Sequence, residues 1–358
     1  MKYEYWFANI KGLGNKEKYQ IRSRINSAEE LYYMEETAIN NIVMRDKQCH
    51  TILESIKEWK LEKEYDELKR KEVHFLTRMS KEYPKKLTEI AASPYALYVK
   101  GKLPMEDQMS VAIVGARQCS PYGEAMTKLF TESLVGAGVQ IISGMARGID
   151  GISQRKAIDV GGSTFAVLGS GVDVCYPREN YMLYTDLQKC GGIISEQPIK
   201  TQPQKTFFPA RNRIISGLAD AVLVIEAKEE SGSLITADMA LEQGKDVYAL
   251  PGPITSQLSK GCNNLIKQGA DILLSPEELL KDLGIFHNSK MENQKENKIV
   301  LESTEKLVYS CLDFEPKNLR CLSEQTKLQI PLLLSSLVGL ELKGYVREVS
   351  KNYYVKVK

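Results

Sequence analysis

Hydrophobic positions in the middle of the chain form short continuous runs, and longer segments with a helical period separate these runs. The runs begin near residues 110, 139, 163, 191, 221, 246 and 271, with the sequences SVAIVGA, VQIISG, STFAVLGSG, GGIISE, AVLVIEA, DVYALPG and DILLS. Strands that are apolar on both faces and alternate with helices are typical of a parallel sheet covered on both sides. The pattern therefore predicts an α/β domain over residues 76–288, with a doubly wound, mostly parallel Rossmann-like sheet.

Residues 1–75 have helical periodicity without strand-like runs, which predicts a small helical N-terminal domain. Within it, KGLGNKEKYQIRSRINSAEELYYM (11–34) places a Gly-Leu-Gly turn directly before a helix. A helix-hairpin-helix has this pattern and binds nucleic-acid phosphate through the turn amides. A helical domain that only packs against its neighbour would have the same pattern, so both interpretations stay open.

The C-terminal part of the chain is set apart by a polar stretch at residues 289–298, which we interpret as a linker. Residues 299–358 then show three helical segments followed by a short hairpin, the order of a winged helix. Many winged helices bind DNA. The third helix, IPLLLSSLVGLELKG, has almost no basic or amide side chains, so a role in protein contact or packing is equally open.

Composition excludes several classes of protein. The 48 basic and 46 acidic residues leave a net charge of +2, so bulk charge does not identify a nucleic-acid partner. The seven cysteines form no Cys-x-x-Cys pair, and the three histidines are isolated, so neither disulfides nor a metal site is expected. The sequence has no apolar run of membrane-spanning length and begins without a secretory signal pattern. We expect a cytoplasmic protein without a membrane association.

Glycine, serine and arginine residues gather where the predicted strands end, the edge at which doubly wound sheets bind their ligands. The first three strands are followed by Gly115, Arg117, Ser143, Gly144, Arg147 and Gly169. Turn amides and helix N-termini at this edge are expected to bind phosphate oxygens. The chain contains neither Gly-x-Gly-x-x-Gly nor a Gly-x-x-x-x-Gly-Lys-Ser/Thr loop, so no nucleotide cofactor and no ATPase activity are expected.

Five arginines are predicted at the same edge, namely Arg117, Arg147, Arg178, Arg211 and Arg213. A guanidinium binds phosphate through two parallel hydrogen bonds and also stacks on bases, so several of them together favour a polynucleotide ligand. The alternative is that some of them pair with the acids predicted nearby, Asp150, Asp173, Glu196 and Glu226. Arg213, which precedes two isoleucines, is the best candidate for a structural role.

Other residues at this edge have two possible roles each. Asp150 near the start of a helix is either a general base or, more commonly, a cap. Ser231, Gly232 and Ser233 precede another helix and either bind phosphate or cap it. Tyr176, Phe207 and Phe208 either stack on bases or belong to the core. No serine has a base beside it in sequence, so no nucleophile is proposed.

The chain resembles the bacterial DNA-processing protein A (DprA, or Smf) family along essentially its whole length. The matching blocks are YPKKLTEIAASPYALYVKG, VAIVGAR, IISGMARGID, AVLGSGVDVCYPREN, GGIISEQP, FPARNRIISGLADAVLVIEA, SGSLITADMALEQGKDVYALPG and GCNNLIKQGA. The resemblance implies a protein that is not an enzyme. Its implied function is to bind and protect single-stranded DNA taken up in natural transformation and to load the RecA recombinase onto it.

The resemblance also implies roles for individual residues. Arg117 and Arg178 match family positions that hold phosphates, and the DNA contacts are expected to include Asn180, Arg211, Asn212 and Arg213, without deciding which of the two arginines faces DNA. A homodimer is expected, with an interface near Leu265, Ile266 and Ile272. The family usually has histidine four residues after the aspartate of Gly-Ile-Asp, where this chain has Gln154, so a catalytic use of that position is not expected.

Two other classes of protein remain as alternatives. A nucleotide phosphoribohydrolase on a related fold would carry a Pro-Gly-Gly-x-Gly-Thr loop with a glutamate close behind, whereas the corresponding stretch is EESGSLITADMA. A scaffold that binds only proteins would not bind an oligonucleotide through residues 76–288.

Overall fold

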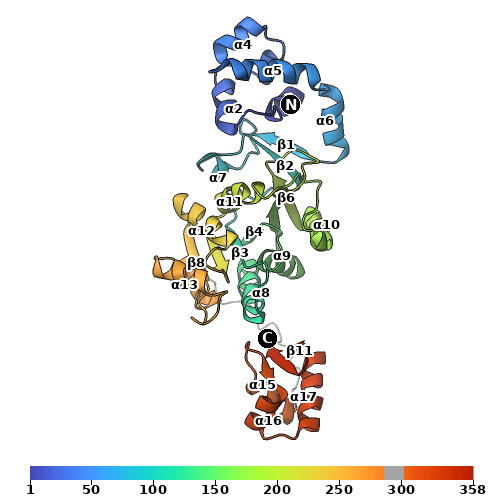
Figure 1. Cartoon of the computed structure of the whole chain (residues 1–358), viewed down its shortest axis with the longest axis vertical. Helices are drawn as coiled ribbons and strands as arrows, with labels where there is room; N and C mark the ends of the chain where they lie inside the picture. The colour runs from blue at the N-terminus through green and yellow to red at the C-terminus, as the bar shows by residue number, and fades with distance from the viewer. Residues whose placement is uncertain (286–301, 358) are drawn as a thin grey trace.

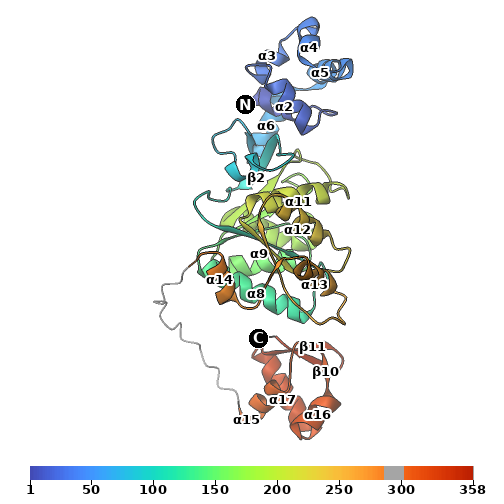
Figure 2. The same ribbon diagram turned by 90° about the vertical axis from the view of Figure 1, so that its left-hand side faces the viewer.

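The structure is a computed structural model that describes residues 1–285 and 302–357. The predicted linker at 289–298 lies outside these residues. An N-terminal helical unit, a central α/β domain and a small C-terminal unit follow one another along the long axis (Figures 1 and 2).

The central sheet contains all seven predicted strands, in the order β6-β5-β4-β3-β7-β8-β9. Every neighbouring pair among them is parallel. Their bounds are β3 Ser110–Gly115, β4 Gln140–Ser143, β5 Thr164–Val167, β6 Gly191–Ser195, β7 Ala221–Ile225, β8 Asp246–Ala249 and β9 Asp271–Ile272. Two strands that were not predicted, β1 His74–Thr77 and β2 Ala96–Gly101, extend the sheet antiparallel beside β6. The prediction of a doubly wound, mostly parallel sheet is therefore confirmed.

Helices cover both faces of this sheet because alternate residues of each strand point to opposite sides. Val111 and Ile113 of β3 pack with α8 Pro121–Gly136, α9 Ile149–Asp159 and α14 Pro276–Asp282. Ala112 and Val114 pack on the other side with α11 Phe207–Leu218, α12 Gly232–Glu242 and α13 Lys260–Lys267. The remaining helical segments of the domain are α7 Lys85–Thr88, the 3₁₀ turn η1 Arg178–Asn180 and α10 Tyr181–Cys190.

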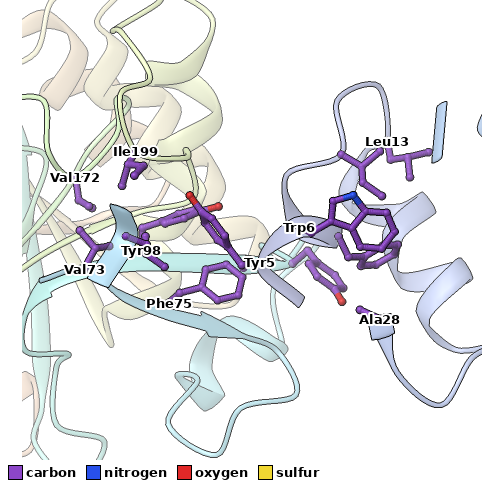
Figure 3. Close-up of a cluster of buried hydrophobic side chains, with 14 of the residues drawn as sticks. Tyr5, Trp6, Leu13, Ala28, Val73, Phe75, Tyr98, Val172 and Ile199 are labelled. Atoms are coloured by element: carbon purple, nitrogen blue, oxygen red, sulfur yellow. The ribbon is translucent and has the colours of Figure 1, made fainter. Parts of the chain in front are cut away.

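The N-terminal unit shares its core with the sheet. Its helices are α1 Lys2–Ala8, α2 Asn15–Arg22, α3 Ala28–Tyr32, α4 Glu36–Ile42, α5 Asp46–Glu58 and α6 Leu61–Arg70. Tyr5 of α1 packs edge-on against Phe75 of β1 and Tyr98 of β2, with ring centroids 5.3 and 6.2 Å apart (Figure 3). In the predicted Gly-Leu-Gly turn, the amide of Gly14 donates to Glu17 Oε2 at 2.9 Å. That amide therefore already has an acceptor within the protein.

The C-terminal unit consists of three helices and a small antiparallel sheet. The elements are α15 Ser303–Ser310, β10 Lys317–Asn318, α16 Leu319–Thr326, α17 Ile330–Leu342, β11 Val346–Ser350 and β12 Tyr353–Lys356. The winged-helix assignment stays a prediction. The unit meets the first turn of α8, where Phe314 contacts Tyr122 with ring centroids 5.8 Å apart and Arg347 pairs with Glu124 at 3.2 Å.

Among residues 1–285 and 302–357, the longest apolar helices fall short of what a membrane crossing requires.

Candidate nucleic-acid interface

A small pocket lies beyond the carboxyl ends of β3, β4 and β5, against the first turns of α11. Its walls are Arg117, Gly144, Ala146, Arg147, Tyr176, Pro177, Phe208 and Arg211, and its volume is about 60 Å³. One water molecule needs roughly 10–15 Å³ of such space, so the pocket has room for a phosphate group but not for a whole nucleotide.

The pocket forms because the loop after β4 lies directly on the loop after β3. Gly148 adopts a left-handed φ of +70°, and a Cβ there would lie 2.2 Å from the carbonyl oxygen of Ala116. The next amide, that of Ile149, donates to the same oxygen at 3.2 Å. Only glycine fits this approach, which brings Arg147 and Arg117 to one pocket. The pair Arg147-Gly148 is the sequence signal for this contact between the two loops, which was not predicted from the sequence.

Arg211 forms the inner wall of the pocket and is 6% exposed. Its Nη1 donates to the carbonyl oxygens of Gly144, at 3.0 Å, and Val167. Asp150 also lies beside Gly144 and accepts that residue's amide at 3.2 Å. A Cβ on Gly144 would come within 2.6 Å of Arg211 and 2.7 Å of Asp150, so a glycine is required between them.

Burial dominates the electrostatics of this inner wall. Burial lowers the pKa of Arg211, Asp150 opposes this shift and the nearby Arg117 adds to it, so that the pKa lies at about 10. Burial also raises the pKa of Asp150, against the effect of Arg211. Arg211 therefore remains a cation at neutral pH. Its Nε atom is buried and has no hydrogen-bond partner among the described residues.

Aromatic side chains form the outer wall. The rings of Tyr176 and Phe208 are tilted by 34° with centroids 5.5 Å apart, and Tyr176 is 45% exposed. The guanidinium carbon of Arg117 lies 6.0 Å from the Phe208 ring centroid. Tyr176 and Phe208 therefore line the pocket, whereas Phe207 does not, and base stacking stays a prediction.

The exposed arginines differ in whether they already have a partner. Arg117 and Arg178 are exposed, and neither has an acidic partner within the described ranges. Arg178 directly follows Pro177 of the pocket wall. Arg147 is also exposed but pairs with Glu179. Asn180 donates its amide to the carbonyls of Met145 and Ala146, at 2.9 and 3.2 Å, and so ties the loop after β4 to η1.

The side chains of Arg211, Asn212 and Arg213 bind mainly to other groups of the protein. Arg213 pairs with both carboxylate oxygens of Glu196, at 2.8 and 2.5 Å, and donates to the carbonyl of Ala92 at 2.9 Å. Asn212 donates to the carbonyl of Gly232 at 3.2 Å, which links α11 to the start of α12. Of the two arginines, Arg211 alone borders the pocket.

Several predicted contact residues lie beneath the pocket or away from it. Ser143 is fully buried and donates its hydroxyl to the carbonyl of Ile113 at 2.6 Å. Gly115 packs on β7, and a Cβ on Gly169 would lie 3.0 Å from Phe208, so both glycines serve close packing. Ser231 caps α12, accepting the amide of Ser233. Ser231, Gly232 and Ser233 do not line the pocket. DNA contact by these residues stays a prediction.

Several amides at this edge already have acceptors within the protein. Gly144 donates to Asp150, and Met145 donates to Oε1 of Gln154 at 3.1 Å. Gln154 is fully buried, so the residue at the family's histidine position supports the loop after β4. An anion at this edge of the sheet would therefore be bound by cationic side chains rather than by these amides.

The predicted dimer residues differ in exposure. Leu265 is 4% exposed and belongs to the core of its own domain, whereas Ile272 on the edge strand β9 is 43% exposed. Ile266 is partly buried. Dimerisation itself stays a prediction. Within the described part of the chain, histidine, cysteine and acidic side chains form no group that could bind a metal ion.

These features define the class of the molecule: a doubly wound α/β protein with an arginine-lined, phosphate-sized pocket beyond its strand ends. The family model for DNA recombination-mediator protein A matches residues 74–284. The chain belongs to this family, and the resemblance to DprA and Smf proteins is confirmed. Protein Smf of Escherichia coli is 39% identical over 288 residues, which are 78% of this chain and 76% of that protein.

Solved structures of the family share the fold. DNA processing protein A from Streptococcus pneumoniae superposes with a TM-score of 0.70 at 34% identity, over 79% of this chain and 98% of that one. DNA processing protein A from Helicobacter pylori, for which a single-stranded DNA binding mode is described, gives a TM-score of 0.54 at 29% identity, over 59% and 95% of the two chains.

Proposed function

We propose that the protein binds single-stranded DNA along the carboxyl edge of its sheet, with the arginine pocket holding one backbone phosphate. The observation that carries the proposal is the convergence of Arg117, Arg147 and Arg211 on one pocket whose outer wall is aromatic. A guanidinium cluster holds phosphate, and exposed rings stack on bases with little sequence preference. The single-stranded DNA binding described for the Helicobacter pylori relative supports this assignment.

In this proposal the path of the strand continues from the pocket to Arg178. Arg178 is exposed, follows the pocket wall directly, and has no acidic partner in the described ranges. Arg117 and Arg178, which have no acidic partner in the described ranges, would then neutralise successive phosphates, while the paired Arg147 adds a weaker contribution. Backbone contacts of this kind orient the strand without reading its sequence.

The biological role that we propose is the one that the family resemblance implies. The protein would protect incoming single strands in the cytoplasm and load RecA onto them during natural transformation, acting as a homodimer and without catalysis. The stretch EESGSLITADMA, which lacks the Pro-Gly-Gly-x-Gly-Thr loop and the glutamate behind it, supports this role over the alternative of a nucleotide phosphoribohydrolase.

The central test is oligonucleotide binding, measured by fluorescence anisotropy with single-stranded and duplex DNA. Replacing Arg117 and Arg178 together by glutamate is expected to weaken single-strand binding on the order of a hundredfold, because two phosphate contacts become repulsive. Lys189→Glu with Lys102→Glu makes the same change of charge. Both lysines are exposed and lie at the opposite edge of the sheet, since Lys189 is in the last turn of α10 and the amide of Lys102 donates to Gly191 at the start of β6.

The control pair is expected to bind within about twofold of the unmodified protein. Equal losses in the two double variants would remove the proposed site. RecA loading is tested separately, by the rate of RecA filament formation on single strands coated with a single-strand-binding protein. An unchanged rate in the presence of this protein would contradict that part of the proposal.

A further inference from the structure

The strand order of the central sheet reverses between β3 and β7. From β3 the chain proceeds through β4 and β5 to β6 on one side, and then crosses to β7, β8 and β9 on the other. Doubly wound proteins bind nucleotides at this reversal, with a phosphate at the N-terminus of the helix that follows the first strand. In this protein that helix is α8, which spans 16 residues from Pro121 to Gly136.

A carboxylate of the protein occupies this position. Glu226 follows β7 directly and is only 4% exposed. Its Oε2 accepts the backbone amide of Ser120 at 2.7 Å, and its Oε1 accepts the Ser120 hydroxyl at 2.5 Å. Ser120 is the N-cap of α8. An amide and a hydroxyl at a helix start are the donors that a bound phosphate would use.

The surrounding backbone is shaped to admit this side chain. A Cβ on Gly123, in the first turn of α8, would lie 2.3 Å from Glu226 Oε2, so the carboxylate fills the space where any other residue would place its side chain. Glu226 itself has a left-handed φ of 55°, which is unfavourable for a residue other than glycine. The chain adopts this conformation at the residue whose side chain enters the crevice.

The strands β3 and β7 also stay paired at the point where a crevice would otherwise open. Their pairing continues to Gly115 opposite Ile225, and the amide of Ala116 still approaches the Ile225 carbonyl at 3.4 Å. Above the crevice, the Tyr122 hydroxyl donates to the carbonyl of Pro251 at 3.2 Å. Protein atoms therefore occupy the base, the phosphate position and the outer side of the site.

We propose that Glu226 is a specificity-determining residue, whose carboxylate takes the phosphate position at the strand reversal and thereby excludes nucleotides from it. Its volume and its negative charge both oppose a second anion at the same donors. Anion binding is then confined to the arginine pocket, where an extended polynucleotide can reach. This inference goes beyond the proposed function and does not depend on DNA binding, because it concerns a separate position at the sheet edge.

The test measures whether removing the carboxylate creates a phosphate site in the full-length protein. Glu226→Gly vacates the position and suits the left-handed backbone. Glu226→Gln removes the charge but keeps the volume. Melting temperatures are measured in sodium phosphate and in sodium chloride at equal ionic strength and pH. We expect phosphate to raise the melting temperature of Glu226→Gly by about 2–4 °C at saturating concentrations.

The unmodified protein and Glu226→Gln are expected to show no specific response to phosphate. A folded Glu226→Gly variant that responds no more than the unmodified protein would overturn the proposal. If Glu226→Gly does not fold in chloride, Glu226→Ser is measured in its place, since its short side chain also leaves the phosphate position vacant. Failure of both variants to fold in either buffer would also overturn the proposal, because the position would then not accept phosphate.

A second measurement tests the position of the carboxylate by a double-mutant cycle. Gly123→Ala is expected to lower the melting temperature of the unmodified protein, because its methyl group collides with Glu226, and to have little effect in the Glu226→Gly background. Equal effects of Gly123→Ala in both backgrounds would contradict the contact. Oligonucleotide binding by folded Glu226→Gly is expected to match that of the unmodified protein, so a failure of DNA binding is distinguishable from a failure of this inference.

Discussion

Two positions at the same edge of the sheet are suited to an anion, and the protein treats them differently. At the strand reversal, Glu226 is buried and accepts both donors of Ser120. At the arginine pocket, Arg117 remains exposed without an acidic partner in the described ranges. Burying an uncompensated charge is costly, so a buried site must be completed from within, whereas an exposed site can remain available for a ligand. The comparison shows that position in a doubly wound sheet does not by itself define a binding site.

The largest effect is expected from separating β3 and β7 at the strand reversal, the position that Glu226 occupies. In Gly115→Ala the added methyl group would lie 1.9 Å from the carbonyl oxygen of Ile225, so β3 and β7 would have to move apart. We expect the free energy of unfolding, measured by urea denaturation, to fall on the order of 4 kcal/mol or more.

Gly136→Ala is the matched control for this change. Gly136 is the last residue of α8, and a Cβ there meets nothing within 4 Å. Its replacement is expected to keep or raise the free energy of unfolding by about 0.5–1 kcal/mol. Similar stabilities of the two alanine variants would mean that β3 and β7 are not in close contact at this point.

The next effect separates an arginine with an internal partner from one without. Arg213→Ala leaves Glu196 without its cation, in a pair whose side chains are 12% and 14% exposed. We expect the free energy of unfolding to fall by about 2–4 kcal/mol, while the folded protein binds a single-stranded oligonucleotide within about twofold of the unmodified protein.

Arg117→Ala is expected to show the opposite behaviour. Its free energy of unfolding should change by less than about 0.5 kcal/mol, and its affinity for the oligonucleotide should fall about tenfold. Denaturation and fluorescence anisotropy on the same preparations measure both quantities. A loss of affinity in Arg213→Ala as large as in Arg117→Ala would show that internal pairing does not decide which arginine is available.

The salt dependence of oligonucleotide affinity is a smaller effect, and it counts the phosphates that the exposed arginines bind. If Arg117 and Arg178 each neutralise one phosphate, the affinity should fall roughly sevenfold between about 50 and 200 mM salt, from a slope near 0.7 per phosphate. Arg117→Ala should reduce the slope by about 0.7. An unchanged slope in that variant would indicate that Arg117 does not contact the backbone.

The smallest effect is a pH dependence at Asp150, behind the arginine pocket. Because burial raises the pKa of Asp150 in the folded protein, the unfolded chain loses this proton first as the pH rises above the ordinary value of about 3.9. The folded state then binds more protons, so this carboxyl makes the protein less stable as the pH increases.

Asp150→Asn removes this titration and keeps an oxygen for the Gly144 amide. The free energy of unfolding of the unmodified protein, minus that of the variant, should therefore decrease between about pH 4 and 7. Urea denaturation at several pH values provides the measurement. Parallel pH profiles would show that the carboxyl titrates alike in the folded and unfolded chains.

The central fold was predictable because its signals are local. Runs such as SVAIVGA and AVLVIEA are apolar at every position, as strands buried on both faces must be, and all seven predicted strands are present. The strands β1 and β2 were not predicted. Their pairing is antiparallel at the edge of the sheet. β1 has only four residues, of which His74 is exposed and Leu76 partly buried, whereas the apolar run ALYV of β2 is a strand signal that the prediction missed.

The candidate site was predictable only in outline. Arg117 and Arg147 could be assigned to one edge from the ends of their strands, and the structure brings them to one pocket. The inward direction of Arg211 and the internal role of Asn212 depend on the rotation of α11 against its neighbours. A sequence in which arginine, asparagine and arginine follow one another does not specify that rotation, because each residue turns by about 100° around the helix axis.

The sequence by itself determined the layered sheet and the edge at which its cations gather, because hydrophobic periodicity and the parallel connection of strands act over neighbouring residues. Only the tertiary structure decided which charges are available. Arg213 meets Glu196 from 17 residues away, Arg147 meets Glu179 from 32, and Glu226 reaches Ser120 from 106. Ion pairs and hydrogen bonds depend on separations of a few ångströms between groups that are remote along the chain, and folding alone sets those separations.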